Sequence, residues 1–93
     1  MNIQIKLLRK PAVIQKTLKP HASLYKDIKE GLFPEPVKLS KQVSAWLEHE
    51  IDQVLAARIR GCDDNEIRSL VEKLEEDRKN YGLNKKYKTD RGE

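Results

Sequence analysis

The sequence predicts a mainly helical domain that carries a small β-hairpin, in the arrangement of a winged helix-turn-helix. Three observations support this fold class. Residues 11–30 contain two short segments with helical apolar spacing, separated by a proline. Residues 37–45 alternate apolar and polar side chains on both sides of a polar turn, as the strands of a hairpin do. After residue 46, two longer segments again repeat apolar residues with the period of a helix.

Length and composition limit the chain to one modest hydrophobic core. It has 93 residues, of which 38% are hydrophobic and 37% are charged. Residues 1–8 are interrupted by Asn2, Gln4 and Lys6, so we expect neither a signal peptide nor a membrane span, and a cytoplasmic protein. One cysteine and two histidines are too few ligands for a structural zinc site. Cys62 is therefore interpreted as a bystander thiol, and no metal ion or other cofactor is expected.

Basic residues are concentrated in the first half of the chain. Residues 1–41 contain nine Lys or Arg and three acidic residues, a local charge of +6. Residues 42–93 contain ten basic and twelve acidic residues, a local charge of −2. A positive field over the predicted hairpin and the first two helices suits a phosphate polyanion as the partner. The alternative is that these lysines only solubilise a small domain.

The first helix is predicted over residues 11–17. Pro11 suits a first helical position because its ring fixes a helical φ and its missing N–H is not needed there. Apolar residues recur at helical spacing on one side, at Val13, Ile14 and Leu18. Pro20 keeps the residue before it out of the helical region, so residues 18–19 are expected to form a tight turn.

A second helix is predicted over residues 20–30, ending at Gly31. Leu24 and Ile28 are four residues apart and therefore share the face that would pack on the core. The opposite side carries Ala22, Ser23, Lys26 and Lys29. Tyr25 lies between the two faces, where its hydroxyl could reach a backbone phosphate. The alternative is a tyrosine that only packs.

The predicted hairpin spans residues 37–45 and has its turn at residues 40–42. Two prolines just before it keep the chain extended. Two strands alone are marginal in water, so the hairpin must lie against the helices. We expect Phe33 and Trp46 to be core anchors, and the alternative for Trp46 is a platform on which a base stacks.

A third helix is predicted over residues 47–59, as the scaffold behind the first two. Its apolar stripe is Leu47, Ile51, Val54, Leu55 and Ile59. A fourth helix over residues 64–80 follows Gly61 and begins with a capping box formed by Asp63 and Glu66. Its apolar stripe is Ile67, Leu70, Val71 and Leu74.

We predict a winged domain at residues 1–60, a C-terminal helix at residues 61–80 and a flexible basic tail at residues 81–93. A helix of this length is marginal alone, so its apolar stripe must be covered. Either it folds back on the domain or it mediates self-association with a second copy. Folding back is favoured because the stripe spans little more than two turns, whereas a coiled coil needs at least three or four heptads.

A series of residues in a fixed order carries a family resemblance. These residues are Leu8-Arg9-Lys10-Pro11-Ala12-Val13, Thr17, Ser23-Leu24-Tyr25-Lys26, Ile28, Gly31, Phe33-Pro34, Pro36-Val37-Lys38-Leu39, Trp46 and Glu50-Ile51-Asp52. On them, the chain resembles the AlpA family of phage and genomic-island regulators from about residue 7 to residue 59. The resemblance implies a winged, MerR-like or excisionase-like DNA-binding domain. Members of the family regulate the transcription of integrase genes or promote excision.

The departures from the family pattern fall on the predicted reading surface. Leu18 stands where the family has the glycine of the turn, and Ser40 stands where the wing usually has a glycine. His21 stands where an arginine is frequent, so it can still bond to a base edge but lacks the bidentate guanine contact. The alternative for His21 is a histidine that only faces solvent. The scaffold therefore matches the family more closely than the surface that would select a DNA sequence.

These observations predict sequence-specific binding of double-stranded DNA by a transcriptional regulator or excision factor of a prophage or genomic island. The helix at residues 20–30 would enter the major groove, and the hairpin at residues 37–45 would act as the wing. The predicted DNA-contacting residues are Lys19, His21, Ala22, Ser23, Tyr25, Lys26, Lys29, Lys38, Lys41 and Gln42. The alternative is a protein-interaction module that uses the apolar face of residues 64–80 to bind an integrase or another regulator.

An enzyme is not predicted, nor is a membrane or a small-molecule substrate as a partner. The sequence has no Gly-rich phosphate loop, no metal-ligand cluster and no nucleophile paired with a base at a meaningful spacing. Activators, repressors and excision factors can share one reading head, so the sequence leaves these roles open, together with the operator sequence and the oligomeric state on DNA.

Overall fold

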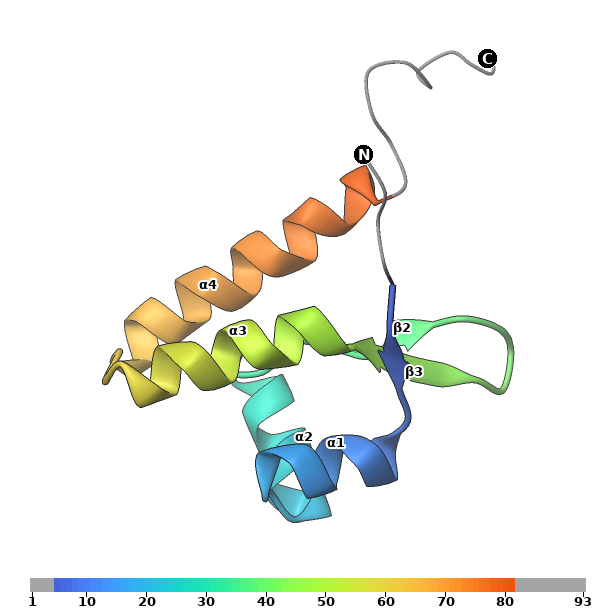
Figure 1. The fold of residues 1–93 in the computed structure, drawn as a ribbon, viewed down its shortest axis with the longest axis horizontal. Coiled ribbons are helices and arrows are strands. Elements are labelled where there is room, and N and C mark those ends of the chain that lie inside the picture. Colours follow the sequence, from blue (N-terminus) through green and yellow to red (C-terminus); the bar gives the residue numbers. More distant parts are fainter. Residues whose placement is uncertain (1–4, 82–93) are drawn as a thin grey trace.

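The computed structural model describes residues 5–81 of the chain. The elements are β1 (Leu7–Leu8), α1 (Lys10–Thr17), α2 (His21–Lys29), β2 (Val37–Lys38), β3 (Ser44–Leu47), α3 (Glu48–Ile59), α4 (Asp64–Asp77) and the 3-10 turn η1 (Arg78–Asn80). In Figure 1, the long helices α3 and α4 lie one above the other, with α1 and α2 below them and the strands at one end. This mainly helical fold with a small antiparallel sheet confirms the predicted class. Within residues 5–81, no helix is both long and apolar enough to cross a membrane.

The first helix, α1, begins at Lys10, one residue before the predicted start, and has Pro11 in its first turn. Val13 is fully buried and Ile14 packs against the core. The prediction that Leu18 completes this apolar side is wrong, because its side chain is 87% exposed. Leu18 adopts a left-handed φ of 61° and donates its N–H to the Ile14 carbonyl at 2.8 Å. It therefore ends the helix and turns its side chain outward.

Replacing Leu18 by glycine should raise the free energy of unfolding by about 1 kcal/mol, because a left-handed backbone costs a residue with a Cβ roughly 1–2 kcal/mol. Little burial is lost, since Leu18 is 87% exposed. Urea denaturation followed by circular dichroism measures the change. Leu18→Ala is the matched control, because it also removes the leucine but keeps the Cβ. A glycine variant no more stable than the alanine variant would rule out backbone relief.

The second helix, α2, has its core side and its exposed side where the sequence predicts them. Pro20 has an extended backbone and is the N-cap, so the helix starts at His21, one residue later than predicted. Leu24 is fully buried and Ile28 packs on the core. The exposed side consists of Ala22, Ser23, Lys26 and Lys29. Gly31, with φ of 78°, follows the end of the helix.

The sheet has three antiparallel strands in the order β1-β3-β2. The predicted hairpin is formed by β2 and β3, with Val37 opposite Ala45. Strand β1 has no counterpart among the predicted elements, because two residues are too few to show alternation. It pairs Leu7 with Leu47. Leu47 accordingly ends β3 and is the N-cap of α3, which begins at Glu48, one residue after the predicted start.

Phe33 and Trp46 are core anchors, as predicted, with exposures of 1% and 2%. The Trp46 indole Nε1 donates to the Pro34 carbonyl at 3.0 Å. This bond satisfies the one polar atom of a buried indole. It also ties β3 to the segment that precedes β2, so Trp46 is part of the scaffold and not a platform for bases.

The third helix, α3, buries a different face from the predicted stripe at its C-terminal end. Ile51 and Val54 are buried as expected, but Ile59 is 85% exposed, so its place in the stripe is wrong. Ala57 is buried instead, and Glu50 is fully buried on the same side. Val54 lies at the middle of this buried face. Successive residues of a helix are about 100° apart, so Ile59, five residues later, points roughly 140° away from it.

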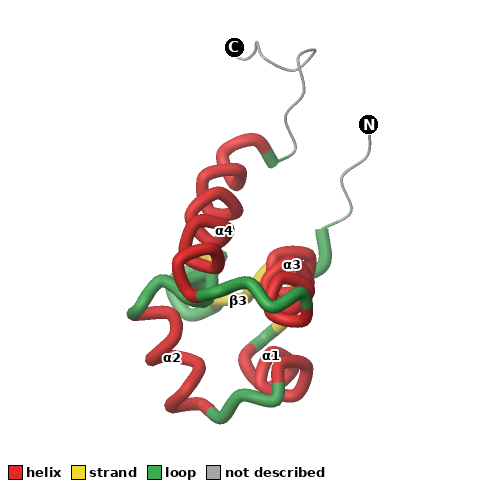
Figure 2. Tube along the Cα trace, turned by 90° about the vertical axis from the view of Figure 1, so that its left-hand side faces the viewer, coloured by secondary structure: helices red, strands yellow, loops and turns green. Residues whose placement is uncertain are grey.

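The fourth helix, α4, begins with the predicted capping box. The Glu66 N–H donates to the Asp63 carboxylate at 2.8 Å, and the Asp63 N–H donates to the Glu66 carboxylate at 2.9 Å. The helix ends at Asp77 and not at residue 80, because η1 follows it. Figure 2 shows α4 running beside α3. The residues of α4 buried there are Ile67, Val71 and Leu74.

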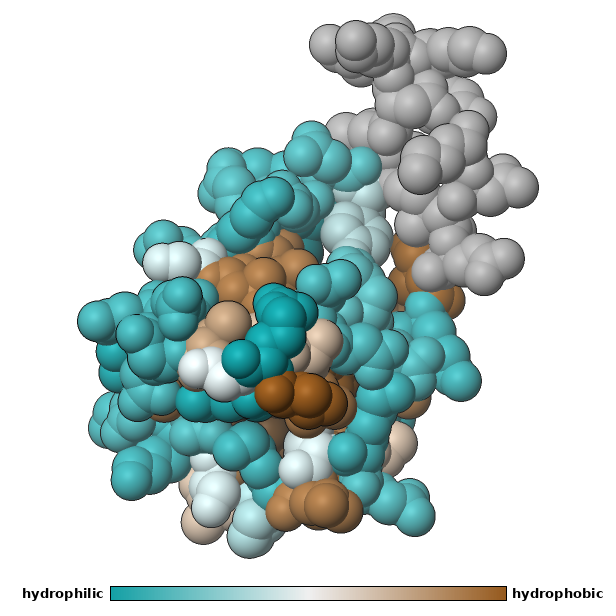
Figure 3. All heavy atoms as spheres, turned by 60° about the vertical axis from the view of Figure 1, so that its left-hand side comes forward, coloured by the Kyte–Doolittle hydropathy of each residue, from teal (hydrophilic) through white to brown (hydrophobic). Residues whose placement is uncertain are grey.

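The apolar stripe of α4 is thus covered by its own chain. Among residues 5–81, none of the exposed large hydrophobic side chains lies on α4. On the face drawn in Figure 3, hydrophobic atoms form only small patches framed by hydrophilic ones. An interaction module would therefore find no exposed stripe on this helix. Apart from Tyr81, the predicted basic tail lies outside the described residues.

Candidate nucleic-acid interface

The exposed side of α2 combines small and basic side chains. Lys26 and Lys29 are exposed, and within residues 5–81 neither has an acidic partner within ion-pair distance. Ala22 and Ser23 are also exposed and leave the helix backbone accessible. An α-helix with its side chains is about 10–12 Å across, so α2 is compatible in size with a major groove of roughly 12 Å width.

Lys19 differs from the other lysines predicted to contact DNA, because within residues 5–81 it alone among them forms an ion pair with an acidic residue. Its Nζ lies 2.6 Å from Asp27 Oδ2, and the Asp27 side chain is only 17% exposed. The Lys19 N–H also donates to Thr17 Oγ1 at 3.3 Å. These contacts tie the turn between α1 and α2 to the start of α2, so Lys19 supports the turn.

His21 and Tyr25 lie one helical turn apart on α2, beside a lysine of α1. Their rings are tilted by 48°, with centroids 4.8 Å apart. Lys10 Nζ lies 3.5 Å from His21 Nδ1 and 5.2 Å from the centroid of the Tyr25 ring. A cation over an aromatic face is attracted to the ring's negative potential. The first turn of α1 thereby places a positive charge beside α2.

The turn of the wing is polar and exposed. Lys38, Lys41 and Gln42 are exposed. The turn is closed by the N–H groups of Leu39 and Ser40, which donate to the Val43 carbonyl at 2.8 and 3.2 Å. These bonds leave the side chains at the tip of the hairpin free to contact a partner.

An open hollow of about 480 Å³ lies between α1, α2 and the wing. It is lined by Arg9, Lys10, Pro11, Tyr25, Pro36, Gln42, Ser44 and Trp46. Two predicted contacts, Tyr25 and Gln42, thus meet across one concave surface although they belong to different elements. The other predicted contacts do not line it. The hollow combines cations with hydroxyl and amide groups, a set that suits a phosphate oxygen.

Sequence reasoning omitted Arg9 and Lys10 from the site. Both line the hollow, and Arg9 is the N-cap of α1. The available signal was a basic pair directly before Pro11, at the predicted start of a helix. Only the fold places this pair opposite Tyr25 and the wing, so the sequence alone could not rank it above other lysines.

Lys6 and Lys16, which lie outside α2, the wing and the hollow, are neutralised within the chain. Lys16 Nζ lies 2.9 Å from Asp52 Oδ1 and 3.1 Å from Glu48 Oε2. Hydrogen bonds to Asp52 and then to Glu48 raise the pKa of Lys16 above its usual value. Lys6 Nζ lies 3.9 Å from Glu48 Oε1. The unpaired positive charge of the first half of the chain therefore collects around α2 and the wing.

Comparison with known proteins identifies the family. The family model described as prophage CP4-57 regulatory protein (AlpA) matches residues 6–59. That range runs from just before β1 to the end of α3 and includes α2, the wing and the hollow. Neither curated proteins nor solved structures gave a match. The resemblance seen in the sequence is confirmed, and the chain belongs to the AlpA family of prophage regulatory proteins, which are DNA-binding transcription regulators and not enzymes.

Proposed function

We propose that the protein binds specific sites in double-stranded DNA and acts as a transcriptional regulator or excision factor of a prophage or genomic island. In this proposal, α2 enters the major groove and the wing contacts the adjacent backbone or minor groove. The observation that carries it is the hollow in which Arg9 and Lys10 meet Tyr25 of α2 and Gln42 of the wing, together with the exposed lysines that α2 and the wing carry outside it. This arrangement would present basic side chains from three elements to a duplex.

The position of each residue suggests which part of the DNA it would contact. Ser23 and Lys26 project from the exposed side of α2 and would approach bases or phosphates, with His21 at the start of the helix. Lys41 and Gln42 would meet the backbone from the wing. Phosphate contacts fix the register of the protein, whereas contacts to base edges select the sequence. The exposed residues of α2 therefore carry the specificity.

A fluorescence-anisotropy titration at several salt concentrations tests this proposal, using DNA from the protein's own genomic neighbourhood. Each phosphate neutralised by the protein contributes about −0.9 to the slope of log affinity against log salt. We expect Lys26→Ala and Lys41→Ala each to flatten the slope by about 0.9. Lys73→Ala is the matched control, because this side chain on α4 is 74% exposed and its removal changes the net charge equally.

The outcomes separate three cases. Flattening by Lys26→Ala and Lys41→Ala but not by Lys73→Ala supports the proposed orientation. Equal flattening by all three would show that only net charge matters, and no flattening by either of the first two would contradict the placement of α2 and the wing. A scrambled duplex of the same length, bound as tightly as the genomic one, would count against sequence-specific binding.

A further inference from the structure

We propose that α4 and η1 act as a brace that fixes the position of the wing relative to α2, with Arg68, Glu75 and Arg78 as positioning residues for DNA binding. This inference rests on the proposed function, because it assigns a role to the distance between the two DNA-contacting elements. The three residues lie beyond the range matched by the family model, which ends at residue 59. The brace therefore belongs to the part of the chain outside that match.

The first contact of the brace is at the end of α2. Arg68 Nε donates to the Glu30 carbonyl at 2.9 Å. The aliphatic part of the same side chain passes over Gly31, where an added Cβ would lie 3.6 Å from Arg68 Cγ. A cation bonded to a carbonyl at a helix C-terminus is also favoured by the helix dipole. Arg68 thus holds the end of the reading helix.

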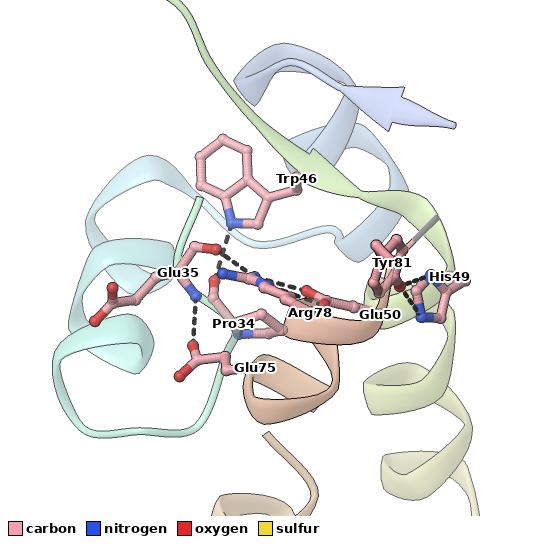
Figure 4. A network of polar contacts seen from close by, with 8 residues as sticks. All are labelled: Pro34, Glu35, Trp46, His49, Glu50, Glu75, Arg78 and Tyr81. Carbon is pink, nitrogen blue, oxygen red and sulfur yellow. Dashed lines mark hydrogen bonds and ion pairs between the residues drawn. The ribbon is translucent and has the colours of Figure 1, made fainter. Parts of the chain in front are cut away.

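The second contact is at the root of the wing, two residues before β2. The Glu35 N–H donates to Glu75 Oε2 at 2.9 Å, and the Glu35 carbonyl accepts from the Arg78 guanidinium at 2.7 Å. Figure 4 shows both bonds converging on Glu35, beside the Pro34 carbonyl that accepts from Trp46. Both backbone polar groups of Glu35 are therefore held by the C-terminal part of the molecule.

The anchor of the brace is a buried charge. Glu50 on α3 is fully buried, and its two carboxylate oxygens accept from Arg78 at 3.0 and 2.7 Å. A buried charge pair with both oxygens bonded has one favourable geometry, so Arg78 cannot move without breaking it. Because Arg78 also bonds to the Glu35 carbonyl, this carbonyl is held at a fixed position relative to the core.

Together these contacts bracket the loop that joins the two reading elements. The loop leaves α2 at Glu30 and reaches β2 at Val37. From Arg68 to Arg78 the chain rises about 15 Å along one axis, so one rigid element contacts both ends of the loop. If the brace is loosened, the wing should lose its fixed distance from α2 and Lys41 should lose its phosphate contact, while Lys26 on α2 keeps its own.

A double substitution, Arg68→Ala with Glu75→Ala, loosens the brace without removing the buried pair. Its matched control is Glu72→Ala with Lys73→Ala, which also removes one acid and one base from α4. Neither Glu72 nor Lys73 makes a hydrogen bond to the wing root or to α2 within the described residues. Thermal unfolding should show both double variants to be folded at the assay temperature.

The test combines each double variant with single lysine substitutions in the salt titration. In the loosened background, we expect the slope to be about 0.9 flatter than in the unmodified protein, and Lys41→Ala to flatten it no further. Lys26→Ala should still flatten the slope by its full amount there. In the control background, both lysine substitutions should keep their full effects. Undiminished flattening by Lys41→Ala in the loosened background would overturn the role of Arg68 and Glu75 as positioning residues.

A measurement without DNA separates this inference from the proposed function. Backbone amide order parameters from NMR should fall at residues 39–43 in the loosened variant and stay unchanged in the control and in α3. Unchanged order at the wing would overturn the role of Arg68 and Glu75 in positioning it, even if DNA binding is confirmed. A wing that loosens as expected, in a protein that binds no DNA, would support the mechanical role of α4 while rejecting the proposed function.

Discussion

Replacing Arg78 by methionine should lower the free energy of unfolding by about 3–5 kcal/mol, because it leaves a buried carboxylate without its partner. Glu50 is the one buried charged side chain among residues 5–81. Methionine keeps much of the length of the arginine side chain but offers no donor. The Glu35 carbonyl loses its bond as well. Urea denaturation followed by tryptophan fluorescence measures the change, since Trp46 is buried and is the single tryptophan.

The Arg78 guanidinium stays charged over the whole neutral pH range. A hydrogen bond to Glu50 raises the pKa of Arg78, although partial burial opposes this shift. A group with a raised folded-state pKa stabilises the protein fully below its unfolded-state pKa and loses that contribution only as the pH rises through the folded value. Because arginine already titrates far above neutrality, deprotonation of Arg78 should not affect stability in any ordinary assay.

Two controls make the Arg78 result specific. Glu50→Gln combined with Arg78→Met should be more stable than Arg78→Met alone, because the uncompensated charge is gone. Lys79→Met, which breaks an exposed pair with Glu76 at 2.9 Å, should cost at most about 1 kcal/mol. If Arg78→Met costs no more than Lys79→Met, or if the double variant is the less stable one, the buried pair does not hold this end of the molecule.

Removing the basic pair of the hollow should weaken DNA binding about 30-fold at 0.15 M salt, if each residue neutralises one phosphate. The variant is Arg9→Ala with Lys10→Ala, and the expected change in the slope of log affinity against log salt is about 1.8. The reason is geometric: both residues line the hollow with Tyr25 and Gln42. Since Arg9 makes no side-chain capping bond in α1, the fold should survive.

The control for the basic pair is Lys73→Ala with Lys79→Ala on the C-terminal side of the molecule. It lowers the net charge by the same two units, from side chains that are 74% and 73% exposed. An equal loss of affinity in the control would assign the effect to net charge. Full affinity and an unchanged slope in the Arg9 and Lys10 variant would show that DNA does not reach the hollow.

Local rules predicted most of the elements. Pro11, Pro20 and Gly31 placed the ends of the first two helices to within one residue, because proline and glycine restrict or free φ regardless of the rest of the chain. The Asp63 and Glu66 capping box is equally local, since its two bonds span three residues. The alternation around the wing turn required only neighbouring side chains.

The sequence by itself thus determined the helices, the hairpin and the fold class, because each depends on short-range spacing, and the ordered series of residues from Leu8 to Asp52 carried the family resemblance. Tertiary structure alone decided that β1 pairs with β3, that Ile59 faces solvent and that Arg9 lies opposite Gln42. Glu50 offered a faint signal as an acid on an apolar helix face, but its partner Arg78 is 28 residues away. The helices must pack before these groups can meet, and their distances depend on that packing and not on any local preference of the chain.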